Sequence, residues 1–586
     1  MSVVEINHQD GLMRRLEEIY QDVDSGTLGA LVDRVMARLE SATSSSGETS
    51  ESRWDESTCV LISYADSVTD GRKSPLSCLH EFVEKNLGDV VDSVHILPFF
   101  PSTGDDGFSV MDYRAVDPRL GSWGDLTKMS ASLKIMADVI LNHGSRSSVW
   151  FRQFVDGETP GSGYFLAVDE DFDISNVIRP REHALLQPVT TAGGERRVWC
   201  TFSEDQVDFD FSNPLLLEEF IGIILDFIDH GIRILRLDAV GFLWKETGTT
   251  CLNLRQTHAI IQFIRYIVDV YDDETVIVTE TNLPNQENLS YFGNGNEAHW
   301  IYNFSLPPLI LYSLLFSDSS ILRRWSMRMP PALSGTSYLN FLSSHDGFGM
   351  RPTEGLLDEA QRQRLLDRLE ANGSLFSRRV KADGTKSVYE ANTTLFSALY
   401  KTDDDPAGTL SSARFVAAYA LMFGLEGIPA IYINSLISAQ NDIDGVAQSG
   451  MKRRINRQKF AKDWLDDRLS DPISRESVGL VKLKELLIIR KQQPAFHPNA
   501  TQFTLQLRSE LFGVWRQSQD RKQSIFAITN LCASEQELDL SLINLIDTEN
   551  WHDLVTQKPI DDNEKNLKMS PYQTVWITNQ AWPSRR

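Results

Sequence analysis

Two charged side chains stand two residues apart in an apolar run that begins after Gly231. The run Ile232–Leu237 has the length and composition of a strand buried in a parallel sheet; it contains Arg236 and is followed by Asp238. Side chains two residues apart on a strand point to the same face, so this guanidinium and this carboxylate should meet. Buried charges need partners out of water, which indicates either a structural ion pair or a reaction site.

Three further apolar runs end in acids or histidines. In a (β/α)8 barrel, the strand ends on one face form the active site, so these groups should converge there. Three carboxylates in one site match retaining glycoside chemistry, which needs a nucleophile, an acid/base and a charge that supports an oxocarbenium-like transition state. The residues at these run ends are Asp138, Asn142, His143, Glu280, His345 and Asp346.

The four runs, in this order, resemble the sequence motifs of the α-amylase superfamily of retaining α-glucosidases, over residues 55–500. The resemblance implies an α/β fold, a (β/α)8 barrel, with Asp238 as nucleophile, Glu280 as acid/base and Asp346 as transition-state stabiliser. It also implies that Arg236, His143 and His345 hold the substrate. Retaining chemistry needs Asp238 ionised and Glu280 protonated, with their carboxyl groups about 5–5.5 Å apart, and Arg236 favours the anion.

Four other segments resemble the sucrose phosphorylase family more narrowly: His95–Phe100, Arg179–Arg181, Tyr389–Asn392 and Ile455–Arg457. In that family phosphate replaces water, attacks the glucosyl-enzyme and releases α-glucose 1-phosphate. Because a phosphate acceptor needs cations and hydrogen-bond donors, the resemblance implies that Arg181 and Tyr389 contact it. It further implies a glucosyl pocket whose wall includes Tyr64, Asp66, His95, Phe202 and Arg457.

Two positions depart from the sucrose-cleaving pattern. Asn282 stands where a sucrose phosphorylase typically has histidine, and Glu390 where it has glutamine. With the segment 346–355 and the N-terminal extension, these differences resemble the glucosylglycerate and glucosylglycerol phosphorylases more closely. Both lie on the aglycone side, so they put fructose recognition in doubt and leave the glucosyl chemistry untouched.

Other functions remain open beside a phosphorylase of a small α-glucoside. A sucrose phosphorylase, or a hydrolase or transglucosidase, would use the same carboxylates, whereas a non-catalytic barrel is disfavoured because all three acids are present. Arg181, Tyr389 and Arg457 favour phosphate over water as the acceptor. The expected partners are therefore inorganic phosphate and a small α-glucoside, with neither cofactor nor metal.

The elements that must position these residues follow from hydrophobic periodicity. Residues 1–54 are predicted to form two amphipathic helices and a Ser-rich linker over 41–50, an extension that packs on the barrel or supports a dimer. Residues 55–500 are predicted to form the barrel, with insertions at about 145–200 and 350–395, and residues 501–586 an antiparallel β domain. The eight barrel strands are expected in the runs 59–66, 94–100, 135–143, 231–238, 275–280, 299–304, 338–346 and 428–433.

Composition limits the possible partners and the compartment. Among 586 residues, 57 Lys and Arg against 81 Asp and Glu give a net charge of −24, which disfavours nucleic acid and anionic membranes as partners. The five cysteines are scattered without C-x-x-C spacing, and the N-terminus has no signal-peptide pattern, so a reducing, cytoplasmic location is expected. The most apolar stretch, 415–425, is too short to span a bilayer. Monomer and homodimer both remain possible.

Overall fold

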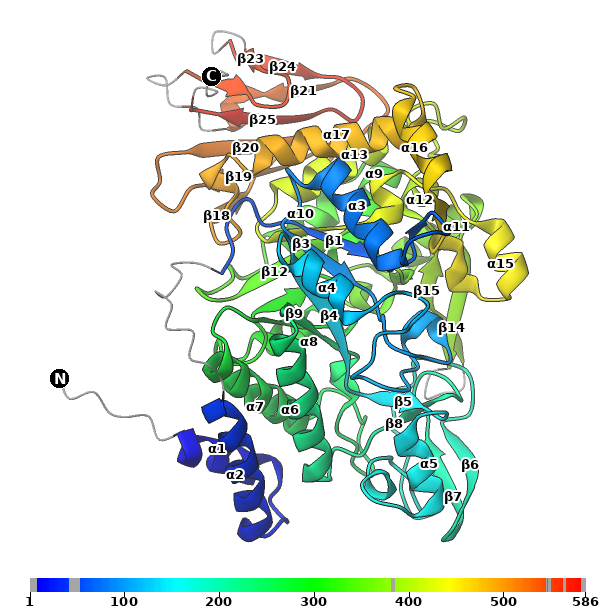
Figure 1. Ribbon diagram of the computed structural model, residues 1–586. Coiled ribbons are helices and arrows are strands. Elements are labelled where there is room, and N and C mark those ends of the chain that lie inside the picture. The colour runs from blue at the N-terminus through cyan, green and yellow to red at the C-terminus, as the bar shows by residue number, and fades with distance from the viewer. Residues whose placement is uncertain are drawn as a thin grey trace, which may run out of the picture.

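Eight parallel strands close into a barrel in the computed structural model, which describes residues 8–41, 53–380, 385–543, 545, 550–561 and 565–580 (Figure 1). Each strand neighbours the next one of the eight along the chain, and the last pairs with the first. This confirms the predicted barrel. In barrel order the strands are β1 Val60–Ser63, β3 Ser93–Ile96, β4 Lys134–Ile140, β9 Ile232–Asp238, β10 Val276–Thr279, β11 Trp300–Tyr302, β12 Ser337–Phe341 and β16 Ile428–Tyr432.

Helices cover the outside of the barrel, which is why its strands are apolar on both faces. Helix α6, Pro214–Asp229, shows how such a helix begins: Asn213 accepts a hydrogen bond from the backbone N–H of Leu215, and proline occupies the first turn. The main covering helices are α3 Pro75–Leu87, α4 Trp123–Ser130, α6, α7 Arg255–Tyr271, α9 Leu306–Phe316, α13 Ser411–Gly424 and α17 Arg475–Arg490. No helix among the described residues is long and apolar enough to cross a membrane.

The strands are shorter than the apolar runs that predicted them. The sequence predicted that Asp346 ends a strand. β12 ends at Phe341, however, so Asp346 lies in the loop that follows. His143 does not extend β4 but begins β5, His143–Ser145, which pairs antiparallel with β8, Gln206–Asp208, outside the barrel. Beyond the barrel rim the backbone loses its ladder partners on both sides, so the polar residues at the ends of these runs belong to loops above the barrel.

Two insertions leave the barrel on the same side of Figure 1. The first contains β5 and β8, helix α5 Val149–Asp156 and a hairpin of β6 Leu186–Thr191 and β7 Gly194–Trp199. The second contains helix α11 Glu359–Ala371 and a three-stranded antiparallel sheet in the order β13 Phe348–Gly349, β15 Lys386–Asn392 and β14 Leu375–Val380. The domain boundaries predicted around these insertions stay predictions.

The N-terminal helices α1, His8–Ile19, and α2, Ser25–Ser41, pack on the barrel helices α6 and α7 (Figure 1). Leu12 and Leu16 are fully buried in the main core, and Arg38 forms an ion pair with Asp226 of α6 at 2.9 Å. The expectation that this extension packs on the barrel is thus confirmed. The predicted linker, apart from Ser41, falls outside the described residues.

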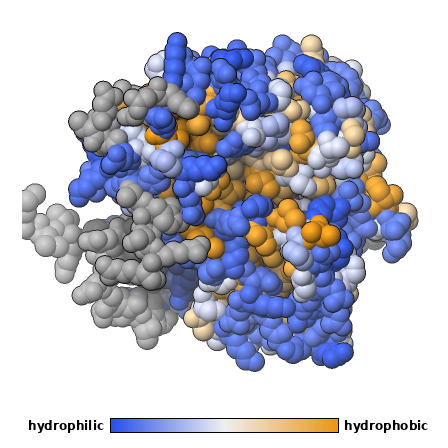
Figure 2. All heavy atoms as spheres, turned by 90° about the horizontal axis from the view of Figure 1, so that it is seen from above, coloured by the Kyte–Doolittle hydropathy of each residue, from blue (hydrophilic) through white to orange (hydrophobic). Residues whose placement is uncertain are grey.

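The C-terminal region has its own apolar core between antiparallel strands, as its alternating pattern predicts. Arg516 is fully buried at its base and donates to the backbone carbonyl of Gly424, which ties this region to α13. Figure 2 views the molecule from this end and shows mostly hydrophilic side chains with hydrophobic ones between them. The sheet order is β18 Thr501–Thr504, β19 Leu511–Gln517, β20 Ser524–Asn530, β25 Thr574–Thr578, β22 His552–Asp553 and β23 Lys558–Pro559, and β21 Gln536–Asp539 pairs with β24 Asn566–Met569.

Candidate active site

Arg236 lies at the centre of the buried charges above the barrel. Arg236 is on β9, and Asp138 stands opposite it on the neighbouring strand β4. Arg236 Nη1 donates to a carboxylate oxygen of Asp138 and, at 2.6 Å, to Asp238 Oδ1. The charges of Asp138 and Asp238 outweigh burial and raise the pKa of Arg236 well above its usual value. The same-face prediction for Arg236 and Asp238 is therefore confirmed.

Glu280 is the first residue after β10 and approaches the same arginine. Its Oε2 accepts a hydrogen bond from the backbone N–H of Ala239 at 3.0 Å and lies 3.8 Å from Arg236 Nη2. The Ala239 backbone is left-handed, with φ 50°, where the chain turns away from β9. This turn aims the N–H that follows Asp238 at Glu280, so the two acids of the predicted pair share one environment.

Burial raises the pKa of both Asp238 and Glu280. Asp238 is raised well above its usual value, because burial and the charges of Glu280 and Asp138 outweigh Arg236. For Glu280, burial and the charge of Asp346 outweigh Arg236 and the Ala239 N–H. The pair therefore keeps a proton to higher pH than two exposed carboxyl groups would. Because Arg236 hydrogen-bonds Asp238 and lies farther from Glu280, it favours the negative charge on Asp238 and the shared proton on Glu280.

Asp346 has the opposite environment. Its Oδ1 is 2.8 Å from Arg453 Nη1 and 3.6 Å from Arg457 Nη2. Burial alone would raise the pKa of Asp346, but these cations and His345 hold it well below the usual range. Arg453 also contacts Glu390, at 3.2 Å, and Glu390 in turn accepts from the backbone N–H of Gly347 at 2.7 Å. Asp346 is thus held as a carboxylate beside Asp238 and Glu280, which share one proton.

Three histidines predicted to hold substrate are buried. His95 Nε2 lies 2.9 Å from Asp138, and His345 stacks on Phe108 with ring centroids 4.9 Å apart. His143 Nε2 lies 3.1 Å from the backbone carbonyl of Phe108. Burial lowers the pKa of His95, that of His143 to about 4 and that of His345 to about 3. All three are therefore neutral near pH 7 and act through hydrogen bonds and ring contacts.

The residues predicted to contact phosphate and aglycone form a continuous group at the rim. The Arg181 guanidinium lies 5.8 Å from the Phe202 ring centroid and 5.5 Å from that of Tyr389. Asn282 donates from its amide to the Tyr389 hydroxyl at 3.1 Å. Burial raises the pKa of Tyr389, so its hydroxyl is neutral and able to donate. In the described part of the chain Arg181 forms no ion pair, which leaves its charge available.

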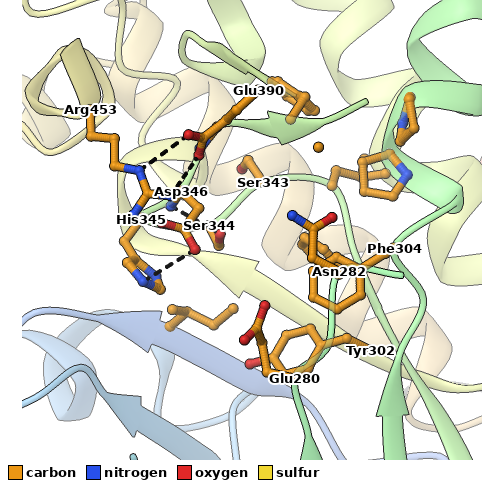
Figure 3. Close-up of a pocket in the computed structure, with 18 of the residues that line it drawn as sticks. Glu280, Asn282, Tyr302, Phe304, Ser343, Ser344, His345, Asp346, Glu390 and Arg453 are labelled. Carbon is orange, nitrogen blue, oxygen red and sulfur yellow. Dashed lines mark hydrogen bonds and ion pairs between the residues drawn. The ribbon is translucent and has the colours of Figure 1, made fainter. Parts of the chain in front are cut away.

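A cavity lies beside these groups (Figure 3); Asn282 and Glu390 line it, and Arg181 and Tyr389 lie outside its lining. Arg453, Asp346 and His345 lie on one side of it and Asn282, Phe304 and Tyr302 on the other, with Glu280 between the two sides. Dashed lines mark the contacts of Arg453 with Glu390 and of His345 with Asp346. Among the predicted residues, those lining this cavity are His95, Arg236, Glu280, Asn282, His345, Asp346 and Glu390.

Several predicted residues lie behind or beside this cavity. Asp238 lies against Arg236, and Tyr64 contacts the His345 ring edge-on with centroids 6.0 Å apart. Asp66 pairs with Lys459 and, together with Tyr64, lines a neighbouring cavity; its predicted place in the glucosyl wall stays a prediction.

Sequence reasoning missed part of the charge network. Arg453 was not singled out from the sequence. Its position four residues before Arg457, in the segment after β16, was the signal that could have indicated a second site arginine. Asp106 forms an ion pair with Arg457 at 2.7 Å, and Asp105 lies 3.5 Å from the same arginine. Both acids have left-handed φ values of 48° and 50°, in the segment Gly104–Gly107. Tyr302, at the end of β11, was also missed. Among the described residues, no group of three or more potential metal ligands is found.

Fold and site together define a member of the α-amylase superfamily. The family model for the catalytic domain of alpha amylase matches residues 84–346. A crystal structure of sucrose 6F-phosphate phosphorylase from Thermoanaerobacter thermosaccharolyticum superposes with a TM-score of 0.71 at 24% identity, covering 88% of this chain and 98% of that one, and supports the fold.

Sequence comparison narrows the family further. The chain is 39% identical over 551 residues to a glucosylglycerate phosphorylase of Allomeiothermus silvanus, covering 94% of this chain and 96% of that protein. It is 35% identical over 566 residues to a glucosylglycerate phosphorylase of Escherichia coli, covering 96% and 98%. The chain therefore belongs to the sucrose phosphorylase family of the α-amylase superfamily, a family of glycoside phosphorylases, and is a glycosyltransferase of that type.

Proposed function

We propose that this protein catalyses the reversible phosphorolysis of glucosylglycerate, giving α-D-glucose 1-phosphate and glycerate through a β-glucosyl intermediate on Asp238. The two relatives that match almost the whole chain carry this activity in their names. Asn282 and Glu390, which differ from the sucrose-cleaving pattern, both lie at the site, so they can define an acceptor other than fructose. Glucosylglycerol is the second candidate donor because it differs only at the aglycone.

In the first half-reaction, an Asp238 oxygen attacks the anomeric carbon while Glu280 gives its proton to the departing glycosidic oxygen. Glu280 has this proton to give because its pKa is raised, and Arg236 stabilises the negative charge on Asp238. Asp346, held ionised by Arg453 and Arg457, stabilises the positive charge that develops on the sugar. The bond to the aglycone breaks and the bond to Asp238 forms.

In the second half-reaction, Glu280 is a carboxylate and takes the proton of hydrogenphosphate as a phosphate oxygen attacks the anomeric carbon. The bond to Asp238 breaks, Asp238 leaves as a carboxylate, and Glu280 is protonated again. The two displacements together retain the configuration of the anomeric carbon, and the same groups act in the reverse reaction.

The observation that carries phosphorolysis over hydrolysis is the rim group of Arg181, Tyr389 and Asn282. Water is far more concentrated than phosphate, so a phosphorylase must bind and orient the anion. In a protein of net charge −24, Arg181 supplies a guanidinium without an ion-pair partner among the described residues, beside a neutral Tyr389 hydroxyl that already accepts from Asn282. These groups can donate several hydrogen bonds to one phosphate.

Phosphate dependence with a panel of donors tests this proposal. The purified protein is incubated with glucosylglycerate, glucosylglycerol or sucrose, each with and without phosphate, and glucose and glucose 1-phosphate are measured separately. We expect phosphate-dependent glucose 1-phosphate, fastest from glucosylglycerate. Glucose released at the same rate with and without phosphate would instead establish a hydrolase, and sucrose as the best donor would establish a sucrose phosphorylase.

We also propose a cytoplasmic location. The five cysteines are buried free thiols, which suits a reducing compartment. Fractionation of source cells, with the activity recovered in the cytosolic fraction, tests this. Solution scattering would distinguish the monomer from the homodimer.

A further inference from the structure

Arg351 is a buried cation that has no ion-pair partner among the described residues. The residue is only 8% exposed, and its Nε atom is buried without a hydrogen bond among the described residues. In the described part of the chain its guanidinium forms no ion pair. Burial lowers the pKa of Arg351, and the charges near it do not compensate. Because an uncompensated buried charge is costly, such an arginine indicates a site for an anion that is not part of the chain.

The short strand β13, which precedes Arg351, forms part of the wall of the catalytic cavity. Phe348 and Gly349, on β13, line that cavity, and the N–H of Met350 donates to the backbone carbonyl of Tyr389 at 2.9 Å. A Cβ on Gly349 would lie 2.5 Å from the Asn282 amide oxygen, so this strand and Asn282 are in close contact. Arg351 therefore lies two residues beyond the strand that faces the predicted aglycone residues, just outside the lining of the cavity.

Arg351 and Arg181 both act on the Tyr389 hydroxyl. Burial raises the pKa of that hydroxyl, and the two arginines oppose the rise. The carboxylates that reach Arg351 electrostatically are Glu287 and Glu354, and Glu354 is already engaged by Arg379 at 2.6 Å. Tyr389 thus has Arg181 over its ring and Arg351 within electrostatic reach, and neither arginine forms an ion pair among the described residues.

We propose that Arg351 binds the carboxylate of an acidic acceptor, and that it selects glycerate over glycerol. This inference rests on the proposed phosphorylase function and names the acceptor's recognition group. A guanidinium matches a carboxylate with two parallel hydrogen bonds, which a neutral hydroxyl cannot replace.

The order of the two half-reactions favours a carboxylate at Arg351 over phosphate alone. Aglycone and phosphate occupy the site in turn, because each presents an oxygen to Glu280. With a neutral aglycone, Arg351 would stay unpaired throughout the first half-reaction, whereas the carboxylate of an acidic aglycone pairs it there. Arg181, over the faces of Phe202 and Tyr389, remains for phosphate.

Acceptor competition in the reverse reaction tests the inference. Wild type, Arg351→Gln and Arg351→Lys receive glucose 1-phosphate with glycerate or with glycerol, and kcat/KM is measured for each acceptor. We expect Arg351→Gln to lower the value for glycerate by about 10- to 100-fold and that for glycerol by no more than about threefold, because one charge-assisted contact is lost. Arg351→Lys should fall between. Arg362→Gln is the matched control, an arginine on α11 that pairs with Glu359 at 2.6 Å, and should leave the acceptor ratio unchanged.

Three outcomes would overturn the inference. Equal losses for both acceptors would assign Arg351 a structural role. A rise in the phosphate KM with an unchanged acceptor ratio would assign phosphate as its anion, and a wild type that prefers glycerol would remove the acidic acceptor.

Calorimetric binding of sodium glycerate to wild type and Arg351→Gln decides the inference independently of turnover. Weaker binding by the variant supports it, and equal binding overturns it. If Arg351→Gln does not fold, the same binding and kinetic comparison is made with Arg351→Lys. A wild type that binds glycerate through Arg351 but forms no glucose 1-phosphate would refute the proposed function while supporting the inference.

Discussion

Replacing Arg453 with glutamine should show what holds Asp346 in its charged form. Arg453 contacts Asp346 at 2.8 Å and Glu390 at 3.2 Å, and its side chain is 20% exposed. Glutamine removes the charge and leaves both acids without their main counter-charge. Asp346 keeps the more distant Arg457, at 3.6 Å, and the contact with His345, and Glu390 keeps the backbone N–H of Gly347.

The magnitude follows from these contacts. Removing one partner of a buried ion pair costs about 3–5 kcal/mol. Partial exposure of Arg453 and the remaining Arg457 reduce this cost to about 2–3 kcal/mol of folding free energy, which thermal unfolding of the variant should show. The sign with pH is also defined. Arg453 lowers the pKa of Asp346, so its removal raises that pKa, and activity, which needs the carboxylate, is lost increasingly as pH falls.

The assay is the pH profile of kcat/KM for phosphorolysis, with thermal unfolding measured on the same samples. Arg362→Gln is the control, because Arg362 pairs with the exposed Glu359 on α11, away from the site. The double variant Arg453→Gln, Glu390→Gln should recover stability relative to the single one, because no unpaired Glu390 carboxylate remains. Its activity should stay low, since Asp346 still lacks its counter-charge.

The reasoning is refuted if Arg453→Gln keeps kcat/KM within about threefold of wild type between about pH 5 and pH 8. A uniform loss at every pH would also count against it, because the argument depends on the pKa of Asp346.

Three other replacements address the remaining roles. Asp238→Asn should lower activity by several orders of magnitude and trap no glucosyl-enzyme, checked by intact mass spectrometry with α-glucosyl fluoride; near-normal turnover would exclude it as nucleophile. Glu280→Gln should slow the natural donor far more than the fluoride, whose leaving group needs little protonation, and equal losses would assign it another role. Arg181→Ala should raise the phosphate KM strongly and increase the share of glucose over glucose 1-phosphate, and an unchanged product ratio would mean that phosphate binds elsewhere.

The barrel and its central acids could be read from the sequence because they depend on local patterns. Eight apolar runs of strand length predicted the eight strands, and the spacing of Arg236 and Asp238 placed both side chains on one face. The motif order identified the family. The roles of the individual site residues, the separation of Asp238 and Glu280 and the domain boundaries stay predictions.

The charge network around those acids was decided by the tertiary structure. Arg453 meets Glu390 across 63 residues, and Arg457 meets Asp106 across 351, through loops that have no periodic pattern. The same packing pairs Asp66 with Lys459 and leaves the Nε of Arg351 buried without a hydrogen bond among the described residues. Hydrophobic periodicity records which face of an element is buried, but an ion pair depends on where two distant loops meet, and that is set by the packing of the whole chain.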